Sequence, residues 1–179
     1  FNTQDPIPSS NLNSVNTINT PISNGTSGIE NLIFTTDDFY ENNPEANEKS
    51  FMDDWFRTGD QGFIDKEGFI TISGRLKEII NRGGEKISPR EVDEVLMDHP
   101  NVEQVVTFSI PHDKLGEEIA AAIVLNQQGA TSEEELKTYA ASKLSDFKVP
   151  RKIIFLEEIP KGATGKLQRI GLSEKLGLN

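Results

Sequence analysis

The sequence lacks cysteine altogether and has only two histidines among its 179 residues. Disulfides, thiolate metal sites and cysteine nucleophiles are therefore excluded, and two histidines are too few for a zinc site, so we expect no metal site built by protein side chains. No apolar run approaches the roughly 20 residues that a membrane-spanning helix needs, and no basic-then-apolar N-terminal signal is present. We expect a cytoplasmic protein without a membrane span.

Basic residues are absent from residues 1–48, which hold seven acidic side chains, and the whole chain has a net charge of −11. Such a chain is repelled by nucleic-acid phosphates and by anionic lipid, which disfavours general nucleic-acid binding and membrane-surface roles. Asn, Ser and Thr dominate the start of the chain, a composition that buries too little apolar surface to offset chain entropy. We predict that residues 1–37 are of low complexity and disordered.

Local signals predict regular structure further along the chain. Pro44 is suited to the first position of a short helix, and two apolar runs around a polar turn predict a β-hairpin within residues 63–72. Ser88, Pro89 and Glu91 have the spacing of a helix N-cap, a first helical residue and a capping box.

The second half of the chain alternates strand and helix patterns. A second helix is expected after Thr131 or Ser132, either of which is suited to its N-cap. Further strands are predicted at residues 102–110, 119–125 and 152–156. From near Lys77 the order is strand, helix, strand, strand, helix, strand, which predicts a small α+β domain with a mixed sheet and helices packed on it.

Three segments carry residues suited to ligand chemistry. Asp60, in Thr58-Gly59-Asp60, is an acceptor-only carboxylate suited to paired sugar hydroxyls, although a plain turn also explains it. Arg75 offers a planar fork of donors for ribose or phosphate oxygens. Lys166 lies in a Gly-rich loop that can carry a cation to a phosphate. The loop is no Walker A motif, which needs four residues between its glycines and Ser or Thr after the Lys.

The sequences of these segments resemble the last three signature motifs of acyl-CoA synthetases in the adenylate-forming superfamily. They read "WFRTGD", "GRLKEIINRGGEKISPREVD" and "PKGATGKLQR". They are most similar to oxalate-CoA ligase and 4-coumarate-CoA ligase-like enzymes. The resemblance covers roughly residues 38–175, and three ordered motifs at consistent spacing make it specific. It implies that residues 38–76 end an N-terminal AMP-binding body and that residues 77–179 form the C-terminal AMP-binding enzyme domain.

The resemblance also implies roles for particular residues. Lys166 is then the catalytic residue, which stabilises charge as an acyl-adenylate forms. Lys77 is the hinge about which the C-terminal domain swings between two poses. ATP or AMP would be bound by Asp60 and Arg75, and CoA by Gly83, Gly84, Glu85 and Arg151.

The implied reaction converts a carboxylic acid, ATP and CoA into acyl-CoA, AMP and pyrophosphate, with Mg²⁺ on the phosphates. The phosphate loop and acyl pocket of the body are not found in this sequence, so a separate N-terminal body is an expected partner. One alternative is a non-catalytic remnant or binding module with weak CoA or AMP affinity. A peptide-synthetase adenylation unit is a less favoured alternative, because the sequence of the hinge loop resembles that of CoA ligases. The resemblance allows a peroxisomal location, but the final residues are not of the Ser-Lys-Leu type.

Overall fold

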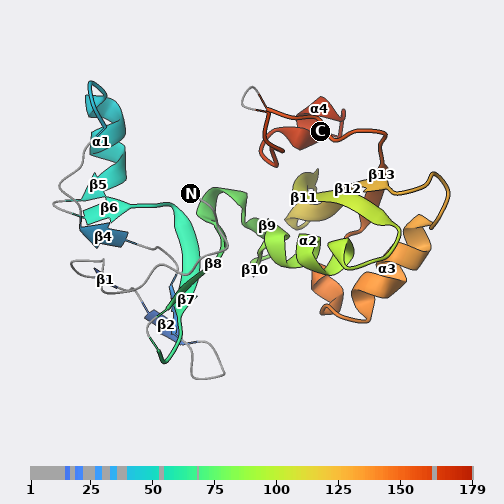
Figure 1. Ribbon diagram of the computed structural model, residues 1–179, viewed down its shortest axis with the longest axis horizontal. Helices are drawn as coiled ribbons and strands as arrows, with labels where there is room; N and C mark the ends of the chain where they lie inside the picture. The colour runs from blue at the N-terminus through green and yellow to red at the C-terminus, as the bar shows by residue number, and fades with distance from the viewer. Residues whose placement is uncertain are drawn as a thin grey trace. The chain divides into compact units, whose positions relative to one another are not determined.

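The computed structural model divides into two compact units, Phe1–Lys77 and Glu78–Asn179, whose elements are labelled in Figure 1. None of the described helices combines the length and apolar character that crossing a bilayer requires. The structure describes residues 40–52, 55–67, 69–162 and 165–178, together with the backbone of strands at 15–16, 19–21, 27–29 and 33–35.

In its described residues, the first unit contains two antiparallel sheets and one α-helix. The strand orders are β1-β4-β6-β5 and β2-β3-β7-β8. The elements are β1 Val15–Asn16, β2 Asn19–Pro21, β3 Ser27–Ile29, β4 Ile33–Thr35, α1 Pro44–Ser50, β5 Phe51–Met52, β6 Trp55–Arg57, β7 Asp60–Ile64 and β8 Ile70–Arg75. The predicted disorder of residues 1–37 falls mostly outside the described residues and stays a prediction, while β1 to β4 are short strands within that range.

Helix α1 and the β7–β8 hairpin confirm two of the sequence predictions. The helix begins at Pro44, and the side chain of Asn43 accepts a hydrogen bond from the N–H of Ala46 at 3.1 Å. In the hairpin, the N–H of Phe69 donates to Oδ1 of Asp65 at 2.8 Å, and the N–H of Asp65 donates to the carbonyl of Phe69 at 3.0 Å. Both features follow from local residues that cap a helix or close a turn.

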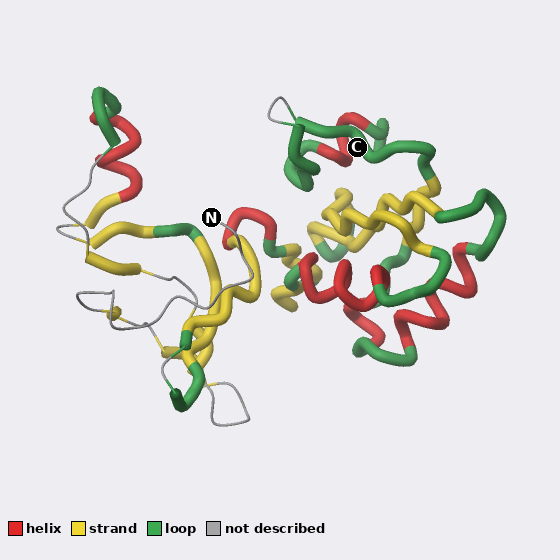
Figure 2. The backbone as a smooth tube through the Cα atoms, viewed as in Figure 1, coloured by secondary structure: helices red, strands yellow, loops and turns green. Residues whose placement is uncertain are grey.

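The second unit is built on a five-stranded sheet. Figure 2 draws the strands in yellow. The order is β10-β9-β12-β11, with β13 pairing parallel to β12 while the other pairs are antiparallel. The mixed α+β fold expected from the sequence is thus confirmed. The 3-10 turn η2 Leu76–Glu78 crosses the boundary between the two units. The elements after it are β9 Ile80–Arg82, β10 Glu85–Ile87, α2 Pro89–Met97, β11 Val102–His112, β12 Gly116–Leu125, α3 Glu133–Ala141, η3 Asp146–Lys148, β13 Lys152–Phe155 and α4 Leu172–Lys175.

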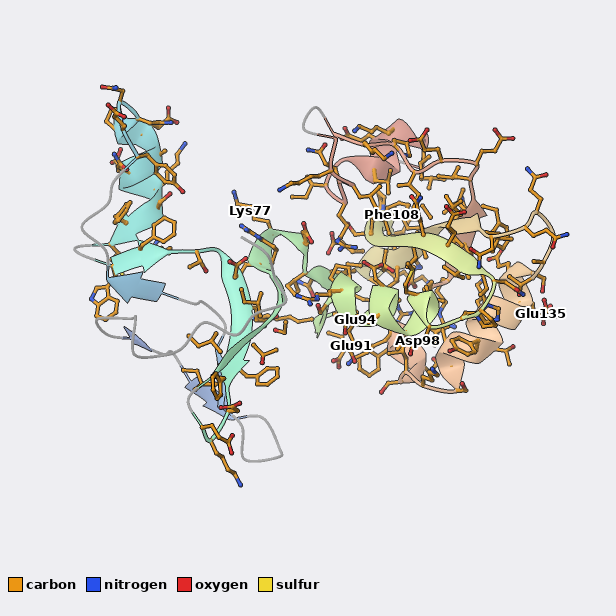
Figure 3. All side chains as sticks on the ribbon, in the orientation of Figure 1. Lys77, Glu91, Glu94, Asp98, Phe108 and Glu135 are labelled. Atoms are coloured by element: carbon orange, nitrogen blue, oxygen red, sulfur yellow. The ribbon has the colours of Figure 1, made fainter. Side chains whose placement is uncertain are left out.

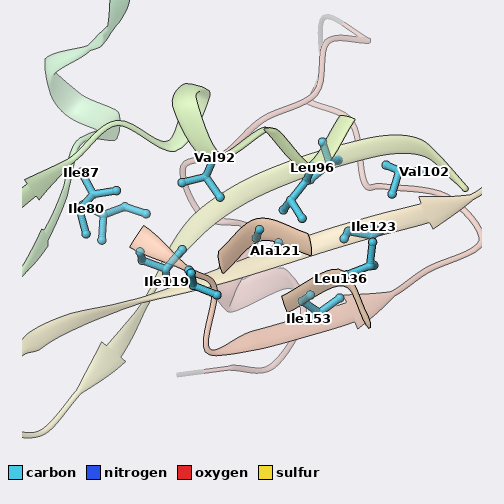
Figure 4. Close-up of a cluster of buried hydrophobic side chains, with 13 residues drawn as sticks. Ile80, Ile87, Val92, Leu96, Val102, Ile119, Ala121, Ile123, Leu136 and Ile153 are labelled. Carbon is cyan, nitrogen blue, oxygen red and sulfur yellow. The ribbon is translucent and has the colours of Figure 1, made fainter. Parts of the chain in front are cut away.

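Strand β12 lies at the centre of the sheet and is buried on both faces. Because side chains alternate across a strand, Ile119, Ala121 and Ile123 face one hydrophobic cluster. That cluster includes Leu96 of α2 and Leu136 of α3, so these helices cover one face of the sheet, as Figure 4 shows. The apolar periodicity of both helices is explained by this single buried layer.

The opposite face of the sheet carries the C-terminal segment. Ala120, Ala122 and Val124 of β12 belong to a second cluster, which also holds Phe108 of β11, labelled in Figure 3. The same cluster contains Ile159 and Leu172, both fully buried. These two residues bracket residues 160–171, so the segment that carries Lys166 is anchored at both ends in the core.

The two longer helices begin in different ways. Helix α3 has a complete capping box, in which the hydroxyl of Ser132 accepts from the N–H of Glu135 at 3.2 Å and Glu135 returns a bond to the N–H of Ser132 at 2.8 Å. Ser88 is the N-cap of α2, but its side chain makes no capping bond. The predicted capping box at α2 is therefore wrong, because the carboxylate of Glu91 binds Lys148 at 2.6 Å instead.

Replacing Ser132 with alanine should lower the free energy of unfolding by about 1 kcal/mol, because the first turn of α3 loses its side-chain acceptor. Ser132→Asn is the matched control, since asparagine retains an acceptor and should keep most of the stability. Urea denaturation of the 179-residue chain measures both variants. Equal stability of Ser132→Ala and the unchanged chain would contradict the role given to the capping box.

Candidate functional site

Asp60 and Arg75 lie directly opposite each other on β7 and β8. Nε of Arg75 is 2.8 Å from Oδ1 of Asp60, and the side chains are 62% and 14% exposed. The two residues predicted to contact a nucleotide are thus brought together. The half-covered carboxylate can accept ribose hydroxyls, while the exposed guanidinium keeps it oriented and still has free N–H donors for an anion.

The turn before Asp60 sets the direction of its side chain. Gly59 has φ of 72°, which favours glycine, and the N–H of Asp60 donates to Oγ1 of Thr58 at 2.9 Å. The carbonyl of Gly59 accepts from the N–H of Leu76 at 2.9 Å, which ties the turn to the end of β8. The Thr-Gly-Asp motif is therefore both a tight turn and the support of an acidic side chain.

Lys77 stands at the end of the first unit, within η2, and its side chain is exposed (Figure 3). A residue at the end of an element between two compact units is where a change in backbone angles moves a whole unit. The structure describes one set of backbone angles here. The hinge role of Lys77 therefore stays a prediction.

Gly83 and Gly84 form the turn of a hairpin between β9 and β10. We did not predict from the sequence that these two segments pair as strands. Their φ values are 61° and 99°, and Arg82 pairs with Glu85 across the turn. Positive φ at both central residues is the geometry of a type I′ turn, which requires glycine or a similar residue. A Cβ on Gly84 would meet nothing within 4 Å, so its backbone is open to a slender ligand.

The Gly83-Gly84 hairpin is held against the start of β12 by polar contacts, of which the Arg82–Glu118 pair is partly buried. Nε of Arg82 lies 2.6 Å from Oε1 of Glu118, with side-chain exposures of 17% and 7%. The N–H of Asn81 donates to Oε2 of Glu117 at 2.6 Å, and the N–H of Gly83 donates to the carbonyl of Leu115 at 2.9 Å. These contacts therefore fix the hairpin next to its exposed glycine turn.

The Glu118 carboxyl has a pKa below its ordinary value of 4.5. Burial acts to raise this pKa, but the hydrogen bonds from Arg82 and from the N–H of Ile119, with the attraction of Arg82, lower it overall. The folded chain therefore favours the ionised form, and the pair adds stability at neutral pH that protonation removes.

Lys166 lies in a loop closed by backbone hydrogen bonds. The N–H of Gly162 donates to the carbonyl of Lys166 at 2.8 Å, and the N–H of Gly165 donates to the carbonyl of Gly162 at 2.9 Å. Lys161 and Leu167 form a β-bridge across its base. Residues 163–164 lie outside the described residues.

The ammonium group of Lys166 is exposed and has no hydrogen-bond or ion-pair partner in the described part of the chain. Its neighbour Lys161 differs, because Nζ of Lys161 lies 2.8 Å from a carboxylate oxygen of Glu158. An exposed, unpaired cation is available to an anionic ligand without breaking an existing contact.

Arg169 sits three residues after Lys166, and sequence reasoning gave it no role. Its guanidinium binds Glu78 at 2.8 Å, Asp93 at 2.7 Å and the carbonyl of Thr107 at 2.8 Å. Burial raises the pKa of Asp93 above its ordinary range, against the attraction of Arg169. The only signal in the sequence was that all three charged residues fall inside the quoted motifs.

Arg151, predicted to bind CoA, is paired with Asp146 at 2.9 Å, and the two side chains are 45% and 85% exposed. Lys148 nearby is bound by Glu91. Arg151 and Lys148 therefore both have acidic partners, and exposed ion pairs such as Arg151–Asp146 exchange readily with other ions. No hydrogen bond or ion pair links Arg151 to Lys166 among the described residues.

The described residues contain no group of three or more His, Asp or Glu side chains arranged to hold a metal ion. Side chains of this part of the chain thus do not fit a resident Mg²⁺, because that ion needs oxygen ligands in near-octahedral geometry. We derive no chemical step through Mg²⁺.

Comparison with known proteins places these residues in a family. Residues 91–166, which include Arg151 and Lys166, match the family described as AMP-binding enzyme C-terminal domain. This part of the chain belongs to that family. Curated relatives of this chain are named as oxalate-CoA ligases, which confirms the resemblance drawn from the three motifs.

The oxalate-CoA ligase of Saccharomyces cerevisiae is 47% identical over 137 residues, which is 75% of this chain and 25% of the yeast protein. The oxalate-CoA ligase of Arabidopsis thaliana is 48% identical over 130 residues, 73% of this chain and 25% of the plant protein. The chain thus spans about a quarter of the length of these relatives. Among solved structures, o-succinylbenzoate CoA synthetase from Bacillus subtilis, in complex with its acyl-adenylate intermediate, has a TM-score of 0.72 and 34% identity, covering 79% of this chain and 29% of that one.

The Arg82–Glu118 pair predicts a specific pH dependence of stability. Because the folded pKa of Glu118 is lowered, its contribution is complete above the unfolded value of 4.5 and is lost as pH falls through the folded pKa. Glu118→Gln should therefore be clearly less stable than the unchanged chain at about pH 7, and the difference should shrink by about pH 3.

Urea denaturation at the two pH values provides the measurement. Glu94→Gln is the control, because Glu94 and Arg90 form an exposed pair on α2 and its loss should change stability little at either pH. A Glu118→Gln difference that is the same at both pH values would show that the ionised pair is not the cause.

Proposed function

We propose that this chain supplies the C-terminal lid of an acyl-CoA ligase, with Lys166 as its catalytic residue. The observation that carries the proposal is the unpaired ammonium of Lys166 on a closed loop, within a domain of the AMP-binding enzyme C-terminal family. The o-succinylbenzoate CoA synthetase from Bacillus subtilis, solved with its acyl-adenylate intermediate, supports adenylate chemistry for a similar domain.

In the first step, a carboxylate oxygen of the acid attacks the α-phosphorus of ATP, and pyrophosphate leaves. As the new P–O bond forms, negative charge moves from the attacking carboxylate onto the α-phosphate oxygens and the departing pyrophosphate. The ammonium of Lys166 stabilises that charge, and a preformed cation does so without reorganising solvent. The product is an acyl-adenylate.

In the second step, the thiol of CoA loses its proton to solvent and the resulting thiolate attacks the acyl carbonyl. A thioester forms, and AMP leaves with the bonding electron pair. The backbone at Gly84, where an added Cβ would meet nothing within 4 Å, is one that a pantetheine arm can approach closely. Glu85 follows on the same exposed turn, and Arg151 exchanges its exposed partner Asp146 for a phosphate of CoA. These contacts belong to the proposal.

The nucleotide is held through Asp60 and Arg75. Asp60 accepts hydrogen bonds from the ribose hydroxyls, and the cross-strand contact with Arg75 keeps its carboxylate in place. Lys77 serves as the hinge between the unit that carries this pair and the unit that carries Lys166. The acid is selected by a body that the described residues do not include.

A binding module with weak CoA or AMP affinity is the second candidate. The observation that favours it is the coverage, because the chain spans about a quarter of the length of the ligases it matches. The two candidates differ in a hybrid ligase, defined as the body of the Saccharomyces cerevisiae oxalate-CoA ligase followed by residues 76–179 of this chain. A lid supports turnover there, and a mere binding module does not.

In the hybrid ligase, Lys166→Ala should slow oxalate-dependent exchange of pyrophosphate into ATP by about 100- to 1000-fold, because one preorganised charge is removed from the adenylation transition state. Thioester formation from supplied oxalyl-adenylate should change far less. Lys161→Ala is the matched control from the same loop and should leave both rates near those of the unchanged hybrid. Similar losses for Lys161→Ala and Lys166→Ala would refute the catalytic assignment.

In the hybrid ligase, Lys77→Pro should slow thioester formation more than adenylation, the reverse of Lys166→Ala. Proline fixes φ and restricts the preceding residue, so the change between two poses is impeded. Exchange of pyrophosphate should persist, while formation of oxalyl-CoA should fall by at least about tenfold. Lys77→Ala should retain both steps, and equal loss of both steps in Lys77→Pro would argue against a hinge.

A further inference from the structure

The guanidinium of Arg169 joins three parts of the second unit that are far apart in the sequence. Nε binds Oε2 of Glu78, which follows the proposed hinge, and Nη1 binds Oδ2 of Asp93 on α2 and the carbonyl of Thr107 on β11. The side chain is 18% exposed. The planar fork of arginine is suited to three acceptors at fixed angles, whereas lysine offers one compact charge.

The acceptors around Arg169 are themselves fixed. Asp93 uses its second oxygen, Oδ1, to accept from the N–H of Thr107 at 2.6 Å, so its carboxylate bridges α2 and β11. The side chains of Asp93 and Glu78 are 17% and 29% exposed. Removing the guanidinium would leave two partly buried carboxylates facing each other, which is costly in a site with little water.

The Lys166 loop directly precedes Arg169 in the chain and has contacts of its own. Gln168 precedes Arg169 and lies over Gly162, where an added Cβ would overlap the Gln168 amide group. The carbonyl of Lys166 accepts from the N–H of Gly162, so the loop is closed on its own base. Since the ammonium of Lys166 has no partner among the described residues, its position depends on the backbone that Arg169 and Gln168 hold.

We propose that Arg169 is a positioning residue, which locks the Lys166 loop to Glu78 and to α2 so that the loop and the hinge end of the second unit move as one body. Arg169 touches no reacting atom in this account and acts through Lys166. The proposal rests on the proposed function for its catalytic consequence, but the mechanical link can be measured without it.

The mechanical link is tested by amide hydrogen exchange on the 179-residue chain. In Arg169→Lys, which keeps the charge and loses the fork, the amide of Gly162 should exchange at least about tenfold faster, while amides of β12 keep their rates. Glu78→Gln removes one contact and should give a smaller change of the same kind. Arg90→Gln, on the exposed face of α2, is the control and should leave Gly162 unchanged.

Two results of the exchange experiment would overturn the proposal. One is an unchanged Gly162 rate in folded Arg169→Lys, which would show that the loop stands without the link. The other is equal acceleration at Gly162 and throughout β12, which would reduce Arg169 to a contributor to global stability. If Arg169→Lys does not fold, Glu78→Gln decides between the same outcomes.

The catalytic consequence is tested by a double-mutant cycle in the hybrid ligase. Arg169→Lys alone should slow adenylation by about 10- to 100-fold, because small displacements of a catalytic group are costly. Added to Lys166→Ala, it should cause no further loss, since it acts through the same ammonium. Independent, multiplying losses would contradict action through Lys166. An inactive unchanged hybrid would instead count against the proposed function and leave the exchange result standing.

Discussion

Strand β12 is buried on both faces, and the other functional segments of the second unit depend on its position. Its alternate residues face the layer of α2 and α3 on one side and the C-terminal segment on the other. The Gly83-Gly84 hairpin is attached where Arg82 pairs with Gly116, at the start of the strand. The Lys166 loop is held against the other face through Ile159 and Leu172. Close packing makes such a two-sided layer stiff.

The functional residues are divided between the two units in a way that suits a two-step reaction. The first unit holds the Asp60–Arg75 pair, which is built from facing positions of one hairpin. The second holds the unpaired cation of Lys166 and the glycine turn that is open at Gly84. In the proposed function, the change of step is a change of backbone angles near Lys77.

The sequence predicted features that depend on neighbours in the chain and missed those that depend on distant residues. Helix α3 began where Ser132 and Glu135 indicated, because a capping box is local. The same pattern at Ser88 failed, because Lys148 lies 57 residues beyond Glu91 and takes its carboxylate. Asp60 and Lys166 were found through their motifs. The link from Arg169 to Glu78 was not, because it joins residues 91 apart and only the fold brings them together.

The most direct measurement of the central claim is the rate of oxalyl-CoA formation by the hybrid ligase, compared with the yeast body truncated before its own C-terminal domain. If this chain is a ligase lid, the hybrid makes oxalyl-CoA and AMP in equal amounts, at a rate at least about 100-fold above that of the truncated body. A folded hybrid that makes no more oxalyl-CoA than the truncated body would contradict the account.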